Sequence, residues 1–249
     1  MIMDCGGSLI KRGSKMARVL MVVAMFVIFY GCGQKTMTPS GADQQNTTPR
    51  AAGLVKLTFD DGPVARTAPV IFLRKDTPLD GNTPAVLDVL RKFGVPATFF
   101  VVGKQVRKYP ELVHREYSEG HSVQNHSYTH RNFTKHSKAQ VARELRMTNQ
   151  AITEAGVPRP HIFRPPYGIT NDRVRSVGAS LGLRQIRWTD KPSEDWDDPP
   201  ASVICKRVVR QVRPGSVVLL HDGSGANTDD ALPCIIRELR AKGYGFGKL

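Results

Sequence analysis

From residue 54 onward, short apolar runs alternate with amphipathic helical patterns, and this alternation constrains the fold more than any other feature of the sequence. The runs predicted as strands cover residues 54–60, 97–102, 122–125, 162–164, 183–188, 216–221 and 245–247. Strands separated by helices pair in parallel and carry the helices outside the sheet. Because about seven such repeats fit into residues 54–249, we expect the α/β class and a distorted, TIM-like (β/α) barrel in one domain.

The predicted helices have recognisable ends. Thr83 and Pro84 predict an N-cap followed by a first-turn proline, and Gly94 predicts the end of the same helix. Ser137 and Gln140 form a capping-box pattern that predicts the start of another helix.

The first 32 residues have the pattern of an export signal. Four basic residues between Lys11 and Arg18 precede an apolar run over residues 19–30, which is followed by Gly31 and Cys32. A run of this length rises only about 18 Å as a helix, less than the roughly 30 Å of a hydrocarbon core. Residues 29–32 resemble a lipoprotein processing site in which Cys32 becomes the lipidated first residue. A plain cleaved signal and an uncleaved anchor are the alternatives.

Residues 33–52 predict a flexible tether between this signal and the domain over residues 53–249. The tether is rich in Thr, Gln, Gly, Pro and Asn and poor in large apolar groups. We therefore expect an exported monomer, extracellular or anchored on the outer side of the cytoplasmic membrane. Contact with the membrane would come only through the signal or its lipid.

The chain is strongly basic, with a formal net charge of +14, which points to anionic partners. Three patterns that would specify such a partner are absent from the sequence: a zinc-finger spacing, a basic region leading into heptads and a Gly-rich phosphate loop. We therefore expect no nucleic-acid partner and no nucleotide-binding fold.

Residues whose side chains could take part in catalysis or bind a metal follow the predicted strands at their carboxyl ends. In a parallel barrel these ends meet on one face, where barrel active sites lie. The residues are Asp60, Asp61, His126, Arg164, Trp188 and His221.

The spacing of the acids and histidines is typical of a metal site with a neighbouring base. Of two adjacent carboxylates, one can bind a metal while the other accepts a proton. His126 and His130, four residues apart, predict two imidazoles on one side of a helical turn. With Asp61 they would supply the three protein ligands that catalytic zinc commonly takes. Taken alone, each pattern is also common in structural turns and surface helices.

Two further residues are candidates for supporting roles. Arg164 could hold a nearby carboxylate ionised and oriented. His221 follows an apolar strand where it reaches the surface, and it could act as a proton donor opposite the metal site.

These residues resemble five ordered motifs of the polysaccharide deacetylases, the NodB homology group also called carbohydrate esterase family 4. The motifs are residues 58–63 (TFDDGP), 126–130 (HSYTH), 164–168 (RPPYG), the pair Asp195 and Trp196, and residues 219–221 (LLH). The resemblance covers residues 54–249. The first three motifs are intact, and their joint occurrence in this order is highly specific.

The resemblance implies a deformed (β/α) barrel and a divalent metal, usually zinc, with cobalt as an alternative. It assigns the metal to Asp61, His126 and His130. It makes Asp60 the general base and Arg164 the residue that steadies it.

The resemblance also implies roles around the reacting acetyl group. His221 would protonate the leaving group, with Asp195 tuning it, although Glu194 and Asp190 are alternative partners. The Tyr167 backbone N–H would stabilise the oxyanion together with the metal. The acetyl pocket would be lined by Leu219, Trp188 and Trp196.

The implied activity is removal of N-acetyl groups from a polysaccharide such as peptidoglycan or a chitin-like oligomer. An acetylxylan esterase, which runs the same chemistry on an ester, is the alternative enzyme. A non-catalytic glycan-binding barrel is the alternative outside catalysis. One departure from the family pattern is the segment 64–81, which predicts a longer loop after the first strand than is usual.

Two cysteines lie in the predicted domain, Cys205 and Cys234. Both fall in predicted helices that flank the same strand, and an exported protein permits a disulfide between them. Two buried free thiols are the alternative.

Overall fold

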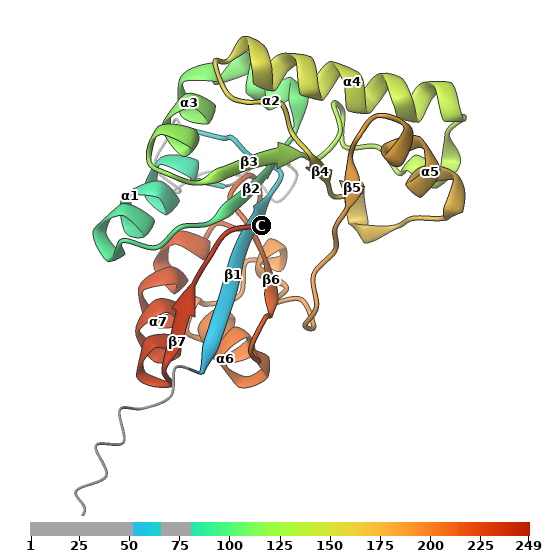
Figure 1. Cartoon of the computed structure of the whole chain (residues 1–249). Coiled ribbons are helices and arrows are strands. Elements are labelled where there is room, and N and C mark those ends of the chain that lie inside the picture. Colours follow the sequence, from blue (N-terminus) through green and yellow to red (C-terminus); the bar gives the residue numbers. More distant parts are fainter. Residues whose placement is uncertain (1–51, 66–80) are drawn as a thin grey trace, which may run out of the picture. The chain divides into compact units, whose positions relative to one another are not determined.

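The computed structural model describes residues 52–65 and 81–249 (Figure 1). The predicted export signal with Cys32, nearly all of the tether and most of the predicted loop lie outside these residues. The strands are β1 (Gly53–Asp60), β2 (Thr98–Val101), β3 (Ser122–Asn125), β4 (Ile162–Phe163), β5 (Arg184–Gln185), β6 (Val217–His221) and β7 (Tyr244–Phe246). All seven predicted strands are therefore confirmed, although β4 and β5 are only two residues long.

The strands form one parallel sheet in the order β5-β4-β3-β2-β1-β6, with β7 paired to the start of β1. This agrees with the predicted distorted (β/α) barrel. Between β5 and β6, within the described residues, an irregular segment takes the place of strand pairing. Thr189 N donates to Val217 O at 3.1 Å, and Val217 N donates to Thr189 Oγ1 at 2.9 Å.

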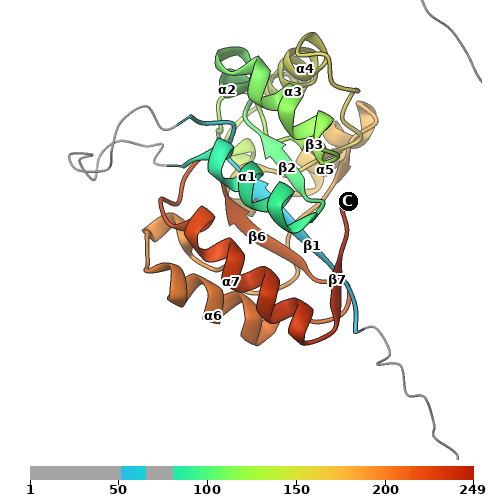
Figure 2. The same cartoon turned by 90° about the vertical axis from the view of Figure 1, so that its left-hand side faces the viewer.

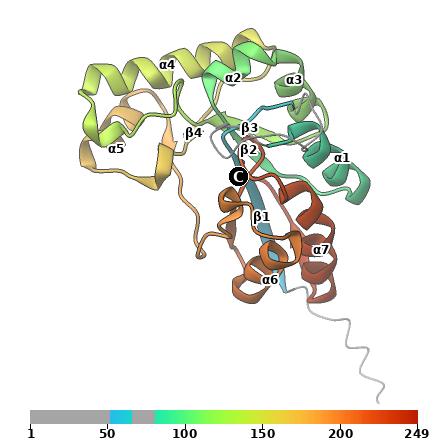
Figure 3. The same cartoon turned by 180° about the vertical axis from the view of Figure 1, so that it is seen from behind.

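The helices lie outside the sheet, as Figures 2 and 3 show from two sides. They are α1 (Thr83–Phe93), α2 (Gly103–Lys108), α3 (Pro110–Ser118), α4 (Lys138–Glu154), α5 (Asp172–Ser180), α6 (Ala201–Gln211) and α7 (Thr228–Ala241). Within the described residues, no helix is both long and apolar enough to cross a membrane.

Two of the three predicted helix ends are confirmed. Gly94 ends α1 in the left-handed conformation, with φ 58°, and Ser137 and Gln140 form both hydrogen bonds of a capping box. The N-cap prediction for Thr83 is wrong, because α1 begins at Thr83 itself. Its hydroxyl instead accepts from Val64 N at 2.8 Å and donates to Asp222 Oδ2 at 2.5 Å.

Two apolar clusters hold the sheet and helices together. The larger combines the inward residues of β1, β2 and β6 with α1, α6 and α7, and includes the stacked rings of Phe59 and Phe99, 5.1 Å apart. The smaller lies beneath α4 and α5 around Phe133, Leu145 and Phe163. Burial of apolar area at roughly 25 cal/mol per Å² is the main force behind this packing.

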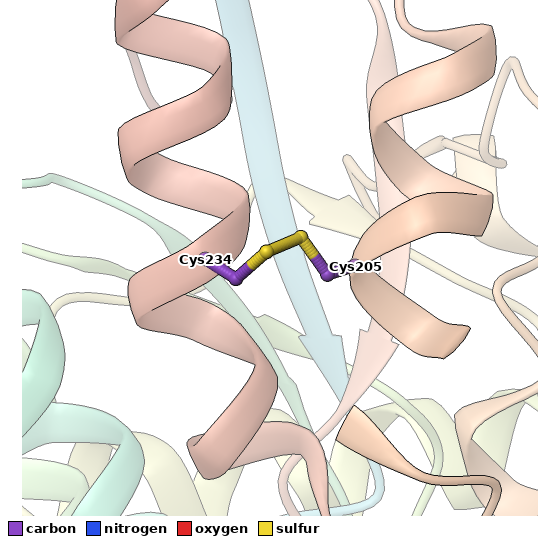
Figure 4. The surroundings of a disulfide bond; sticks show 2 residues. All are labelled: Cys205 and Cys234. Carbon is purple, nitrogen blue, oxygen red and sulfur yellow. A yellow bond between two sulfur atoms is a disulfide. The ribbon is translucent and has the colours of Figure 1, made fainter. Parts of the chain in front are cut away.

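A disulfide joins α6 and α7 (Figure 4). Cys205 and Cys234 have Cα atoms 6.0 Å apart, and Cys205 is buried. Of the two alternatives that the sequence left open, the structure contains the disulfide.

Candidate active site

The predicted site residues meet at the carboxyl end of the sheet because neighbouring strands end together there. Asp60 on β1 lies in register with His221 on β6, and His126 directly follows β3. They line a cavity of about 510 Å³ together with Asp61, His130, Tyr167, Gly168, Trp188, Trp196, Leu219 and Ser224. Arg164 and Asp195 are buried and contact the cavity residues from behind.

Asp61, His126 and His130 form a cluster suited to a metal ion. Asp61 Oδ1 lies 3.4 Å from His126 Nε2 and 3.1 Å from His130 Nε2. The three residues thus offer one metal-ligating atom each, and these atoms all lie within 4.8 Å of one another. Asp61 Oδ1 is buried without a hydrogen-bond partner. A carboxylate oxygen left in this way beside two imidazole nitrogens fits a divalent cation such as zinc.

The two histidines are not held on a helical turn, so that part of the prediction is wrong. Residues 126–130 form an irregular loop, and Ser127 and His130 have φ values of 69° and 55°. Side chains supply the acceptors that a helix would have supplied. Asn125 Oδ1 accepts from Ser127 N at 2.9 Å, and Ser127 Oγ accepts from His130 N at 2.9 Å. The carboxylate of Glu144 accepts from the two N–H groups between them.

Hydrogen bonding on the far side of the ring orients His126. Its Nδ1 lies 2.8 Å from the backbone oxygen of Arg164, so Nδ1 carries the proton and donates it there. In the neutral ring, Nε2 then carries the lone pair and faces Asp61, which is the tautomer that a metal ligand needs.

Burial and the neighbouring charges shift the pKa values of the cluster residues in opposite directions. Burial raises the pKa of Asp61, but the neighbouring imidazoles of His126, His130 and His221 bring it well below its usual range. Burial lowers the pKa of His130, and the charge of Asp61 only partly reverses this. Both shifts favour the forms that bind a cation: an ionised carboxylate and a neutral imidazole.

One carboxylate oxygen of Asp60 is held by Arg164, and the other faces the cluster of Asp61, His126 and His130. Its Oδ1 lies 2.6 Å from Nη1 of Arg164, which is fully buried and also donates to Thr58 Oγ1 at 2.9 Å. Its Oδ2 lies 3.6 Å from His126 Nε2. The guanidinium carbon of Arg164 lies 4.1 Å from the centre of the Phe100 ring. This arrangement leaves one fixed carboxylate oxygen of Asp60 beside the proposed metal position.

His221 is paired with Asp195. Its Nδ1 lies 2.9 Å from Asp195 Oδ1, and its backbone N–H donates to Asp195 Oδ2 at 2.7 Å. Burial lowers the pKa of His221, but the charge and hydrogen bond of Asp195 raise it to about 9. The other acids considered for this role lie elsewhere, because Glu194 pairs with Arg207 and Asp190 accepts from Thr189.

Residues 47–186 match the family model described as polysaccharide deacetylase, which is more than half of the chain. The chain belongs to the polysaccharide deacetylase family.

Known members of the deacetylase family cover most of the described domain. A chitooligosaccharide deacetylase of Sinorhizobium fredii is 40% identical over 196 residues, covering 75% of this chain and 83% of that protein. A bifunctional xylanase/xylan deacetylase of Cellvibrio japonicus is 39% identical over 198 residues. That match covers 80% of this chain but only 27% of the larger protein.

The fold is also that of a solved family member. The structure of a family 4 carbohydrate esterase from Streptomyces lividans, in complex with acetate, superposes with a TM-score of 0.69. The two sequences are 38% identical, and the match covers 80% of this chain and 93% of the other.

Aromatic side chains line the active-site cavity of this deacetylase. Tyr167 is 60% exposed, and its hydroxyl donates to the backbone oxygen of His130 at 3.3 Å. The Trp196 ring stands edge-on to His221, with centres 5.3 Å apart. Trp188 lies so close to Gly168 that an added Cβ there would come within 2.3 Å of its ring. The glycine therefore allows the tryptophan to reach the cavity.

Ser224 is a site residue that the sequence reasoning missed. Its Oγ donates to Asp61 Oδ2 at 3.0 Å, and it lines the cavity. This bond occupies one oxygen of Asp61 and leaves the other for a cation. Its place three residues after His221, in a glycine-rich turn, is the one signal that could have pointed to it.

Proposed function

We propose that this chain is a metal-dependent deacetylase that hydrolyses N-acetyl groups of a polysaccharide. The observation that carries the proposal is that three kinds of functional group line one cavity. These are a three-residue cluster suited to a cation, a buried carboxylate beside it, and a histidine whose raised pKa keeps it protonated at neutral pH.

Asp61, His126 and His130 would hold the metal, which we propose to be Zn²⁺, with Co²⁺ as a substitute. When bound, such an ion polarises a carbonyl oxygen and lowers the pKa of water to about 7. The unpartnered Oδ1 of Asp61 and the Nε2 atoms of both histidines beside it support this assignment.

The proton transfers fall to Asp60 and His221. Asp60 Oδ2 accepts the proton of the attacking water, while Arg164 prevents the carboxylate from turning away. The backbone N–H of Tyr167 would donate to the oxyanion, a contribution typically worth about 3 to 4 kcal/mol. His221 Nε2 then donates its proton to the leaving amine, because Nδ1 is engaged with Asp195.

The substrate would be a glycan outside the cytoplasmic membrane, either peptidoglycan or a chitin-like oligomer. The signal pattern over residues 1–32 and the net charge of +14 support this location. The disulfide between α6 and α7 also supports it, since disulfides persist in oxidising compartments. Cys32 would carry a lipid that anchors the protein, with residues 33–52 as the tether.

Acetate release by the full chain tests the proposal. The chain is supplied with Zn²⁺ or Co²⁺ and offered N-acetylglucosamine oligomers, peptidoglycan and acetylated xylan in parallel, before and after chelation. We expect chelator-sensitive release from at least one N-acetylated glycan. If the metal-loaded protein releases acetate from none of the three glycans, this result would contradict the proposed deacetylation.

Ester hydrolysis is the second candidate, favoured by the similarity to the xylanase/xylan deacetylase. The same cavity residues would serve, because an alkoxide leaving group also needs the proton of His221. Release of acetate from acetylated xylan alone would select this activity over N-deacetylation.

A further inference from the structure

A second cavity, of about 310 Å³, adjoins the loop that carries His126 and His130. We call it the α4 pocket, because most of its lining comes from α4 and the segments leading into it. Its lining residues are Tyr128, Thr129, Arg131, His136, Gln140, Arg143, Glu144 and Met147. The deacetylase mechanism above uses none of the cationic residues in this lining.

Two guanidinium groups of the α4 pocket are available to an external anion. Arg131 and Arg143 are exposed, and neither forms an ion pair within residues 52–65 and 81–249. Glu144, the acid in the lining, directs both oxygens at the loop instead. Its Oε2 accepts from Tyr128 N at 3.0 Å and Thr129 N at 2.8 Å, and its Oε1 accepts from the Thr129 hydroxyl at 2.9 Å. Because Arg131 and Arg143 are two cations and Glu144 is one carboxylate whose oxygens are already hydrogen-bonded, the lining has a net positive charge.

The start of α4 adds to this positive field. The helix spans Lys138–Glu154 and begins at the N-cap Ser137, next to the lining residue His136. The N-terminus of a helix carries a partial positive charge and is a favourable place for anions. The His136 ring adds a nitrogen donor to the same lining.

We propose that the α4 pocket binds an anionic group carried by the glycan, either a carboxylate or a phosphate ester. Guanidinium groups bind both oxyanions through paired hydrogen bonds. Arg131 directly follows His130, and successive Cα atoms lie about 3.8 Å apart. The α4 pocket therefore borders the loop of the active site, and we place the anionic group on the same glycan chain as the acetylated sugar. The proposal rests on the proposed function and narrows its substrate to acidic glycans.

Three tetrasaccharides distinguish the source of the charge. One is a neutral N-acetylglucosamine tetramer, and the second is the same tetramer with a 6-phosphate. The third alternates N-acetylglucosamine with N-acetylmuramic acid carrying free lactyl carboxylates. Binding to the full chain is measured by calorimetry and turnover by acetate release. The variants are Arg131→Gln and Arg143→Gln. The matched control is Arg146→Gln, an exposed arginine on α4 outside the pocket lining.

We expect both pocket variants to weaken binding of one anionic tetramer at least about tenfold more than binding of the neutral tetramer. The tetramer that responds identifies carboxylate or phosphate as the group bound. Arg146→Gln should change binding of none of them. Equal losses for neutral and anionic tetramers, or no loss, would overturn the subsite. Acetate release by the wild type from any of the three tetramers tests deacetylation separately, so that the subsite and the proposed function can each be contradicted without the other.

Discussion

Asp60 and Asp61 are adjacent in sequence but differ in their surroundings. Asp60 ends β1 and is fixed by Arg164, whereas Asp61 has a positive φ of 75°. Successive side chains of a strand point to opposite faces, so a regular strand would have turned Asp61 away from the cavity. The left-handed conformation turns it toward the histidines, at a cost of roughly 1 to 2 kcal/mol. Strain of this kind is typical of functional sites, and it lets two neighbouring carboxylates have separate roles.

The pairing of His221 with Asp195 predicts how activity depends on pH. His221 donates its proton only while protonated, so activity should persist below its pKa of about 9 and fall as pH rises through that value. In Asp195→Asn the charge that raises this pKa is lost, and the alkaline limb of the kcat/KM profile should move to lower pH. Glu194→Gln is the matched control, because Glu194 pairs with Arg207 and not with His221. An unchanged limb in Asp195→Asn would contradict the pairing.

Ser224 predicts a change in metal affinity. Without the hydroxyl that holds Asp61 Oδ2, the carboxylate is free to turn, and Ser224→Ala should bind Zn²⁺ about 10- to 100-fold more weakly. Competition with a chelating indicator measures this without any reference to turnover. Ser224→Thr, which keeps the hydroxyl, should retain most of the affinity. If the alanine variant binds zinc as tightly as the wild type, Ser224 does not position Asp61.

Among the elements, α4 supports the loop of the predicted metal ligands. The side chain of Asn125, at the end of β3, donates to Asn149 Oδ1 at 2.7 Å and to Leu145 O at 2.8 Å. Glu144, on the same helix, holds the next backbone N–H groups of the loop. The capping box at Ser137 starts this helix where these side chains can reach the loop. The geometry of the histidines therefore depends on a helix that begins eight residues after His130.

The disulfide between α6 and α7 predicts a loss of stability on its removal. The two cysteines are 29 residues apart in sequence, and cross-linking a loop of this length stabilises a fold by about 3 to 4 kcal/mol in the chain-entropy model. Combined Cys205→Ser and Cys234→Ser should lower the free energy of unfolding by an amount of this order, measured with denaturant. Reductant should destabilise the wild type and leave the double variant unaffected. A wild type insensitive to reductant would contradict the bond.

For the whole molecule, a buried carboxyl group limits stability. Glu116 on α3 is fully buried, and neither of its oxygens has a hydrogen-bond partner among the described residues. Burial raises its pKa well above the usual range, and the charge of Asp222 raises it further. The folded state therefore binds this proton more tightly than the unfolded chain does, so stability falls as pH rises above the ordinary pKa of a glutamate.

Replacing the carboxyl group by an apolar side chain should therefore stabilise the fold. Glu116→Leu should raise the unfolding temperature, and the gain should be larger at pH 8 than at pH 5, because the wild type loses stability with rising pH. A buried unpaired polar group costs about 1 to 3 kcal/mol, which sets the size of the effect. Glu111→Leu, at an exposed position of α3, is the control. A variant less stable than the wild type at both pH values would contradict the argument.

The sequence by itself determined the seven strands, the capping box and the residues at the strand ends. These features depend on local periodicity and on short motifs. For that reason residues such as Asp60 and His221 could be placed at one edge of a parallel sheet without coordinates. The order of the motifs was enough to identify the family.

Only the tertiary structure decided which side chains meet. Asp195 rather than Glu194 or Asp190 contacts His221, Ser224 reaches Asp61 across 163 positions, and Cys205 bonds with Cys234. The loop at residues 126–130 departs from a helical turn because acceptors on β3 and α4 replace its internal hydrogen bonds. Each of these outcomes depends on the contact of segments far apart in the chain, and periodicity and spacing along the sequence carry no information about such contacts.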